Sequence, residues 1–279
     1  MKVPILLYHE IISDEAALAK VDVRKRPYCL SRAQFQEQMT YLQENNFKTI
    51  RLHELVEALE REEVPEGKSV VITFDDGCVS DFKEAYPVLK RLGQRAVFFV
   101  TAGAVGDKGM LNWDQIKEML DGGMEIGSHT LTHPFMAALD EEELKYELAE
   151  SKRVMEEHLE REIDLFSSPT GYHHPAVGKI AKMVGYQAVC INQIGGVDLG
   201  TDPFALKRLT LKRHHRLAAF KAFVELKSGM ICYHRAGQIL RNMAKRTLGV
   251  KGYEPLRKAL LRLKGVVRRD YISLNTYNL

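Results

Sequence analysis

Strand and helix signals alternate along most of this chain, and this alternation restricts the fold more than any other feature. β-rich runs such as Val70–Phe74 and Ala96–Val100 are separated by segments with apolar residues at helical spacing, such as Tyr86–Leu92. This order is typical of a parallel sheet flanked by helices. An open doubly wound sheet and a barrel both fit, and both place functional groups at the carboxyl ends of the strands.

The remaining elements follow the same two signals. The apolar run that ends at His9 predicts a buried N-terminal strand, and Ser31 with Gln34 forms a capping box that opens the first helix. The sequence predicts further strands at 47–50, 124–126, 164–166 and 188–191, and further helices at 52–59, 113–120, 140–159 and 177–184.

Composition predicts a single domain. Of the 279 residues, 45% are hydrophobic, which is enough to bury one sizeable core without disulfides, and no stretch has the composition of a linker. The four cysteines are isolated in the sequence, as expected of reduced thiols in a cytosolic protein. The N-terminal apolar run is too short for a signal peptide or a membrane span. We therefore expect the protein in the cytoplasm or peripherally at the inner membrane face.

Positive charge is concentrated near the C-terminus, where residues 235–270 hold 11 Lys or Arg and two acids. Pro255–Lys264 has amphipathic helical spacing. The segment is either a terminal helix packed by its leucines or a contact for an anionic membrane surface. We expect no nucleic-acid binding, because the tail lacks the interleaved aromatic residues of a stacking surface. Glycine-rich phosphate loops are missing from the sequence, which argues against nucleotide-cofactor chemistry.

Two polar clusters follow predicted strands, at the edge where a site is expected. Asp75 and Asp76 follow one strand, and His129 and His133 follow another. Two imidazoles four residues apart can face one cation if their segment forms a single helical turn. One aspartate would complete the ligand set of a hydrolytic metal site, and the other would accept a proton as water attacks.

The same clusters carry a family resemblance. Thr73–Gly77 (T-F-D-D-G) and Gly127–His133 (G-S-H-T-L-T-H) together resemble two motifs of the polysaccharide deacetylase family, also called the NodB-homology or carbohydrate esterase type. Phe166–Gly171 looks like the third motif of that family. The resemblance extends over residues 3–211 and leaves the basic tail uncovered.

The resemblance implies an α/β fold, namely an irregular (β/α) barrel of the NodB-homology type in a single domain. By motif position it implies that Asp75 is the general base. It also implies that Asp76, His129 and His133 bind a divalent metal ion, usually zinc. The backbone amide of Thr170 corresponds to the family's donor to the tetrahedral oxyanion.

The family also uses a histidine as general acid, in a motif of the form L-x-H. The string that ends at His9 matches this form, as in the circularly permuted branch that includes poly-N-acetylglucosamine deacetylases. Met230–His234 is a looser match and keeps His234 as an alternative. We prefer His9, because it ends a clean predicted strand directly before the capped helix region.

This chain departs from the family at Ser167, where many members place an arginine that pairs with the catalytic base. The permuted branch often lacks this arginine, so we interpret the serine as a sign of that branch. The residue that tunes Asp75 is then open. Asp198 and Asp202 fall near the family's fourth motif and are the candidates for that role.

Together these features predict a metal-dependent deacetylase that hydrolyses the N-acetyl group of an N-acetylated sugar in a glycan or glycan precursor. Residues 1–234 would form the barrel, and residues 235–279 a basic helical extension packed on or near it. Two alternatives share the fold: hydrolysis of a non-sugar amide, and non-catalytic binding of a glycan or membrane surface. The intact Asp75, Asp76, His129 and His133 argue against the binding protein.

Overall fold

The computed structural model describes residues 2–63, 65, 67–169, 175–240, 243 and 247. The chain divides into two compact units, Met1–Ile231 and Cys232–Leu279. The second unit is helical over residues 232–240. The amphipathic segment Pro255–Lys264 lies outside the described residues, and the predicted division at residue 234 stays a prediction. No helix among the described residues combines the length and apolar character needed to cross a lipid bilayer.

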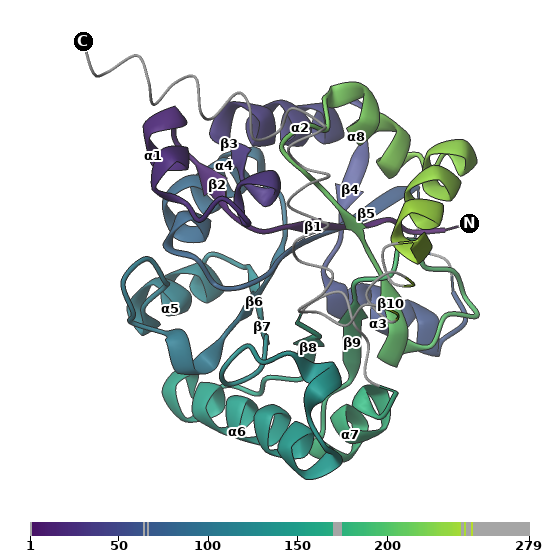
Figure 1. Cartoon of the computed structure of the whole chain (residues 1–279). Coiled ribbons are helices and arrows are strands. Elements are labelled where there is room, and N and C mark those ends of the chain that lie inside the picture. The colour runs from purple at the N-terminus through teal and green to yellow at the C-terminus, as the bar shows by residue number, and fades with distance from the viewer. Residues whose placement is uncertain are drawn as a thin grey trace. The chain divides into compact units, whose positions relative to one another are not determined.

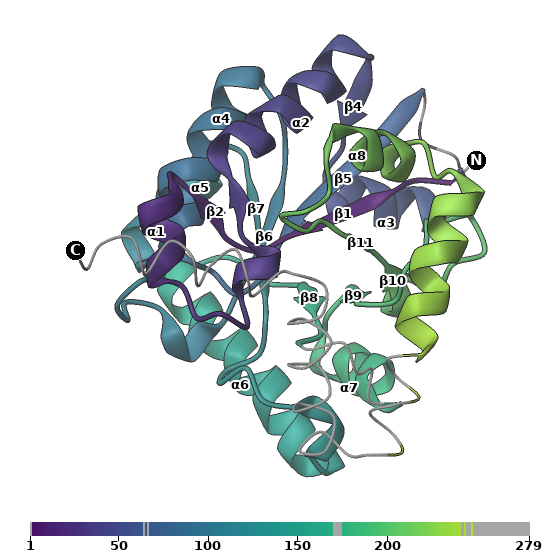
Figure 2. The same cartoon turned by 45° about the horizontal axis from the view of Figure 1, so that its top comes forward.

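The first unit is built around a parallel sheet that curls into a nearly closed barrel, with helices on the outside (Figures 1 and 2). The predicted barrel fold is therefore confirmed. A separate parallel pair, β2 (Ile11–Ile12) and β3 (Leu30–Ser31), follows the first strand. In spatial order the barrel strands are β10 (Leu206–Lys207), β9 (Ala188–Ile191), β8 (Leu165–Ser167), β7 (Glu125–Ser128), β6 (Val97–Val100), β5 (Lys68–Phe74), β1 (Ile5–Tyr8) and β11 (Leu209–Thr210), with β4 (Phe47–Thr49) beside the first half of β5.

The two edges of this sheet meet at Arg208. β10 pairs with β9, whereas β11 pairs with β1, where Leu209 lies opposite Leu6. Only Arg208 separates β10 from β11 in the sequence. One extended segment therefore belongs to both edges of the sheet and nearly closes the ring between them.

Most of the helices lie outside the ring of strands (Figure 1). Helix α2 begins at the predicted capping box, in which Ser31 accepts from the backbone of Gln34 and the Gln34 side chain accepts from the backbone of Ser31. The predicted helices and strands are all observed, with small differences at their ends. The α-helices of this unit are α1 (Glu15–Lys20), α2 (Arg32–Glu44), α3 (Leu52–Glu60), α4 (Tyr86–Leu92), α5 (Trp113–Asp121), α6 (Glu141–Leu159), α7 (Val177–Val184) and α8 (Leu217–Val224).

The inside of the barrel changes from apolar to polar along the strands. One buried cluster joins inward-facing strand residues to the apolar face of α3, and its strand members include Ile5, Val71, Leu165 and Leu206. Side chains two or four residues further along a strand share the same face. At those positions, toward the carboxyl ends, stand four polar residues: His9, Asp75, Ser167 and Arg208. The strand period therefore directs these four side chains toward the same end of the barrel interior.

Candidate active site and metal centre

Asp75 follows β5 directly and is held by a buried arginine. The Nη1 and Nη2 atoms of Arg208 donate to Oδ1 and Oδ2 of Asp75, each at 2.7 Å. The Oγ atom of Ser167 donates to Oδ1 of the same carboxylate at 3.1 Å. Both charged side chains are almost fully buried, with 0% of Arg208 and 1% of Asp75 exposed. The two residues thus form a bidentate ion pair out of reach of solvent.

Arg208 is a site residue that the sequence analysis overlooked. Burial raises the pKa of Asp75, but the charge and hydrogen bonds of Arg208, together with the charges of the nearby histidines, outweigh burial and hold that pKa below its usual value. Arg208, which lies where the two edges of the sheet meet, therefore pairs with Asp75 in place of the arginine that many family members have at the position of Ser167. The sequence gives little signal for this role, because Arg208 stands beside Lys207, and only the fold shows that Arg208 is the buried one of the two.

The two aspartates proposed to tune Asp75 have other partners. Asp198 forms an ion pair with Lys2 at 3.1 Å. Asp202 accepts from the backbone N–H of Phe204 at 2.9 Å and caps the short 3-10 helix Pro203–Ala205. The expectation that either residue tunes Asp75 was wrong, because an arginine contacts the carboxylate directly.

Asp76, His129 and His133 form the second cluster. The Nε2 atoms of His129 and His133 lie 3.6 Å and 3.4 Å from Oδ1 of Asp76. One donor atom from each of the three residues lies within 4.8 Å of the others, which is near enough for one cation to join them. With 17% of Asp76 and 37% of His133 exposed, this cluster is open to solvent.

Residues 129–133 do not form the single helical turn that would let two imidazoles four residues apart face one cation. The segment is irregular, and the backbone of Thr130 (φ 70°) and of His133 (φ 57°) is left-handed. Asp76 is left-handed as well, with a φ of 82°. These bends, rather than the spacing of a helix, bring the two imidazoles to the same carboxylate oxygen. Such conformations are uncommon for residues other than glycine and frequent at functional sites.

Hydrogen bonds from outside the cluster hold the histidine segment. Glu147 of α6 accepts from the backbone N–H groups of Leu131 and Thr132, each at 2.9 Å, and from the Thr132 hydroxyl at 2.6 Å. The Nδ1 atom of His129 lies 2.8 Å from the carbonyl oxygen of Ser167. Because a carbonyl only accepts, Nδ1 carries the proton and Nε2 is left with a lone pair toward Asp76.

The residues fit a divalent metal ion. Burial lowers the pKa of His129 to about 4, so this imidazole is neutral near pH 7. Burial raises the pKa of Asp76, but the hydrogen bond from His133 and the nearby histidines lower it well below its usual value. Metal binding requires neutral imidazoles and an ionised carboxylate, so His129 and Asp76 are in the required states. Burial lowers the pKa of His133, but Asp76 and Asp75 raise it above its usual value, so a bound cation would displace the proton of this imidazole. Two imidazole nitrogens and one carboxylate oxygen are a donor set suited to zinc.

His9 follows β1, and its imidazole is close enough to Asp75 and Asp76 to feel the charges of both carboxylates. Burial lowers its pKa, although the charges of Asp76 and Asp75 act in the opposite direction. Its ring packs against Tyr28, with 5.1 Å between the ring centroids. Its Nδ1 atom is buried and has no hydrogen-bond partner within the described part of the chain.

The predictions for His234 and Thr170 have different outcomes. The rival string Met230–His234 lies within helical residues 228–240, so it lacks the strand form on which the choice of His234 depended. Thr170 lies outside the described residues, and its backbone role stays a prediction.

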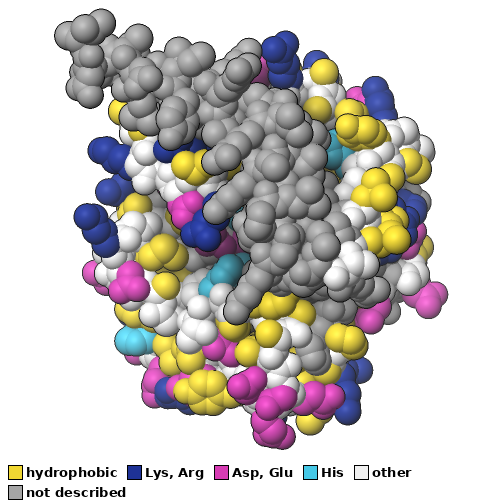
Figure 3. All heavy atoms as spheres, viewed as in Figure 1, with side chains coloured by type: hydrophobic (Ala, Val, Ile, Leu, Met, Phe, Trp, Pro, Cys, Tyr) yellow, Lys and Arg dark blue, Asp and Glu magenta, His cyan; other side chains and the backbone are white. Residues whose placement is uncertain are grey.

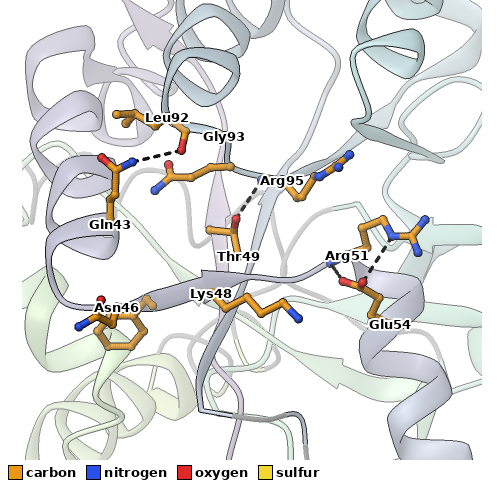
Figure 4. A pocket seen from close by; sticks show the side chains of 11 residues that line it. Gln43, Asn46, Lys48, Thr49, Arg51, Glu54, Leu92, Gly93 and Arg95 are labelled. Carbon is orange, nitrogen blue, oxygen red and sulfur yellow. Dashed lines mark hydrogen bonds and ion pairs between the residues drawn. The ribbon is translucent and has the colours of Figure 1, made fainter.

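A cavity of about 830 Å³ lies apart from these residues (Figure 4). It is lined by β4 and by the segments that follow α2 and α4, where Thr49 accepts from the backbone N–H of Arg95 at 3.0 Å. These segments lie at the amino ends of β5 and β6, opposite Asp75, and that end of a barrel usually serves stability. Figure 3 instead shows acidic, basic and histidine side chains around a hollow near the middle of one face.

The chain is similar in sequence and in fold to several known proteins. Residues 62–189 match the family model described as polysaccharide deacetylase. The chain is similar to YxkH of Bacillus subtilis, whose name places it among the polysaccharide deacetylases, with 30% identity over 80% of this chain and 76% of the relative. It is similar to a peptidoglycan-N-acetylglucosamine deacetylase of Bacillus cereus, with 33% identity over 46% of this chain and 58% of that protein. The solved structure of the Streptococcus pyogenes deacetylase PplD in complex with acetate aligns with a TM-score of 0.70 and 24% identity, over 77% of this chain and 94% of that one, and supports the fold.

Proposed function

Because the chain belongs to the polysaccharide deacetylase family, we propose that it hydrolyses the N-acetyl group of an N-acetylated sugar in a glycan or glycan precursor. The observation that carries the proposal is the pairing of a buried, charge-held carboxylate with an adjacent cluster that fits a cation. The name of the Bacillus cereus relative supports a sugar amide as the substrate class.

In this proposal Asp76, His129 and His133 hold the cation, and zinc is the ion that their donor set favours. A divalent ion in such a site lowers the pKa of water and polarises a carbonyl group. Asp75 accepts the proton that leaves the water as its oxygen attacks the acetyl carbon. Arg208 keeps Asp75 ionised for this step and fixes its orientation.

His9 is the proposed general acid. It gives a proton to the sugar nitrogen as the C–N bond breaks, so that acetate and a free amine are released. Burial lowers the pKa of His9, which makes its imidazolium a stronger acid toward the departing amine. The backbone amide of Thr170 remains the proposed donor to the oxyanion by motif position.

The test combines metal content with acetate release from N-acetylglucosamine oligomers. We expect the wild type to bind zinc and release acetate. Asp75→Asn should keep zinc but lose activity by about 10²- to 10⁴-fold, whereas His133→Ala should lose both. The control is His158→Ala, because His158 stacks on Trp113 with 4.2 Å between ring centroids and should behave like the wild type.

The outcomes separate the alternatives. Zinc binding without acetate release would keep the metal site and redirect the search to non-sugar amides. A wild type that binds no metal in any preparation would contradict the hydrolase and favour a binding protein of the same fold.

We also propose that the basic segment 235–270 contacts an anionic membrane surface, which would place the protein at the inner membrane face. Its 11 Lys or Arg against two acids support this, because each basic side chain near an anionic bilayer is attracted to it. The test is sedimentation with phosphatidylglycerol vesicles. Equal binding by the full chain and by a chain that ends after His234 would reject the contact.

A further inference from the structure

The two oxygens of Asp76 face different partners. Oδ1 faces the Nε2 atoms of the two histidines, whereas Oδ2 lies 3.7 Å from Nζ of Lys25. Lys25 lies in the loop between α1 and the short helix Arg26–Tyr28, and 64% of its side chain is exposed. Its ammonium group therefore reaches from the surface to a carboxylate that is mostly buried.

Arg24 and Arg26, on either side of Lys25, contact groups outside the metal cluster. Arg24 forms an ion pair with Asp22 at 2.7 Å. Arg26 donates to the carbonyl oxygens of Val21 and Ala19 at 3.1 Å and 3.0 Å. Lys25 thus differs from both neighbours, because its charge meets the proposed metal cluster.

The backbone fixes the place from which Lys25 reaches. Its N–H donates to the carbonyl oxygen of Asp22 at 2.8 Å, and its carbonyl oxygen accepts from the N–H of Tyr28 at 2.8 Å. The next part of the loop is tied to the barrel, because the N–H of Arg213 donates to the carbonyl oxygen of Pro27 at 2.9 Å. A loop held at both ends keeps the ammonium group near Asp76 at a low entropic cost.

We propose that Lys25 is a positioning residue of the metal centre, which holds the outer oxygen of Asp76 so that Oδ1 alone is offered to the cation. This inference rests on the proposed function. A carboxylate with both oxygens free can bind a cation through both, and it would then occupy a position needed by water or substrate. Partners outside the ligand set orient ligands and tune a metal in this way.

The charge of Lys25 has two effects of opposite sign. A fixed positive charge beside the ligand repels a cation and reduces the negative charge that the cation meets, so metal binding is weaker with Lys25 than without it. The same reduction leaves the bound cation more electron-poor and more effective on water and on a carbonyl group. Removal of the charge should therefore tighten zinc binding and slow the reaction.

The experiment measures zinc affinity by competition with a chromophoric chelator, together with kcat for acetate release. We expect Lys25→Met to bind zinc on the order of tenfold more tightly and to show a lower kcat. Lys25→Arg keeps the charge and should stay within about threefold of the wild type in both measurements. Arg24→Met is the matched control, because it removes the same formal charge one residue away, and it should leave both values close to the wild type.

Tighter zinc binding together with a lower kcat in Lys25→Met is the result that distinguishes the proposed role from a structural defect. A variant that is merely misfolded would bind zinc more weakly and also react more slowly. The inference is overturned if Lys25→Met binds zinc as the wild type does or more weakly, or if Arg24→Met produces the same change. A wild type that binds no zinc would instead contradict the proposed function.

Discussion

Replacement of Arg208 by methionine tests how strongly the structure depends on the ion pair with Asp75. Besides that carboxylate, Arg208 donates to Asn192 Oδ1 at 2.6 Å and to Ser167 Oγ at 2.8 Å. Arg208→Met would leave the carboxylate of Asp75 buried and unpaired. Loss of one partner of a buried ion pair lowers the free energy of unfolding by about 3–5 kcal/mol. This is a large part of the roughly 5–15 kcal/mol that stabilises a typical domain.

The assay is urea unfolding of the metal-free protein, followed by circular dichroism. Asp75→Asn and the double variant complete a double-mutant cycle. The sum of the losses of unfolding free energy in the two single variants should exceed the loss in the double variant by about 2 kcal/mol. Arg153→Met is the matched control. Its bond to Glu150 is equally short, at 2.6 Å, but 55% of Arg153 is exposed, so its loss should stay within about 0.5 kcal/mol.

Two results would refute the reasoning. One is a loss below about 1 kcal/mol for Arg208→Met, which would mean that solvent reaches the pair. The other is simple additivity of the two single losses, which would mean that the residues do not stabilise each other.

Three further predictions concern other residues. His53 contacts two carboxylates that raise its pKa to about 10, from about 6.5 when unfolded, so its stabilisation is complete below that lower value and is lost toward pH 10. The Tm difference between the wild type and His53→Gln should shrink over that range. Gly127→Ala would place Cβ 2.6 Å from the Phe99 ring and cost about 1–3 kcal/mol in urea unfolding. Glu147→Ala should weaken zinc binding, measured by chelator competition, about 10- to 100-fold, because it releases residues 129–133.

Each of these has a contrary result. A Tm difference for His53→Gln that stays constant from pH 6 to pH 10 would show that the charge of His53 does not contribute. An unchanged urea midpoint for Gly127→Ala would mean that the Phe99 ring and the backbone at Leu165 both move aside without cost. Zinc affinity that is unchanged in Glu147→Ala would show that the histidine segment holds its shape without α6.

The main elements of the fold could be predicted because they depend on local patterns. The run Val70–Phe74 is apolar on both faces, as a buried parallel strand requires, and the Ser31 capping box marks the start of a helix in any context. The closing strands could not be predicted in the same way. β10 and β11 have two residues each, and their pairing depends on the arrival of β1 and β9 from distant parts of the chain.

The site residues also divide into those that local motifs reveal and those whose role depends on distant parts of the chain. Asp75, Asp76, His129 and His133 could be found because they stand together in motifs at strand ends. Arg208 belongs to no motif, and its role depends on a contact with a residue 133 positions away in the sequence. The irregular backbone of residues 129–133 could not be predicted for a related reason, since side-chain acceptors such as Glu147 stabilise left-handed backbone that the residue types alone disfavour.

The seam at Arg208 also has a consequence for the synthesis of the protein. β1 leaves the ribosome early, but its partner β11 follows only after about 200 further residues, and long-range pairing of this kind forms late. Until then Arg208 does not hold Asp75, so the proposed base of the newly made chain is neither enclosed in the barrel nor fixed in orientation. Hydrolytic activity would therefore appear only in chains that have finished folding, so the nascent enzyme should stay inactive until its last barrel strand is in place.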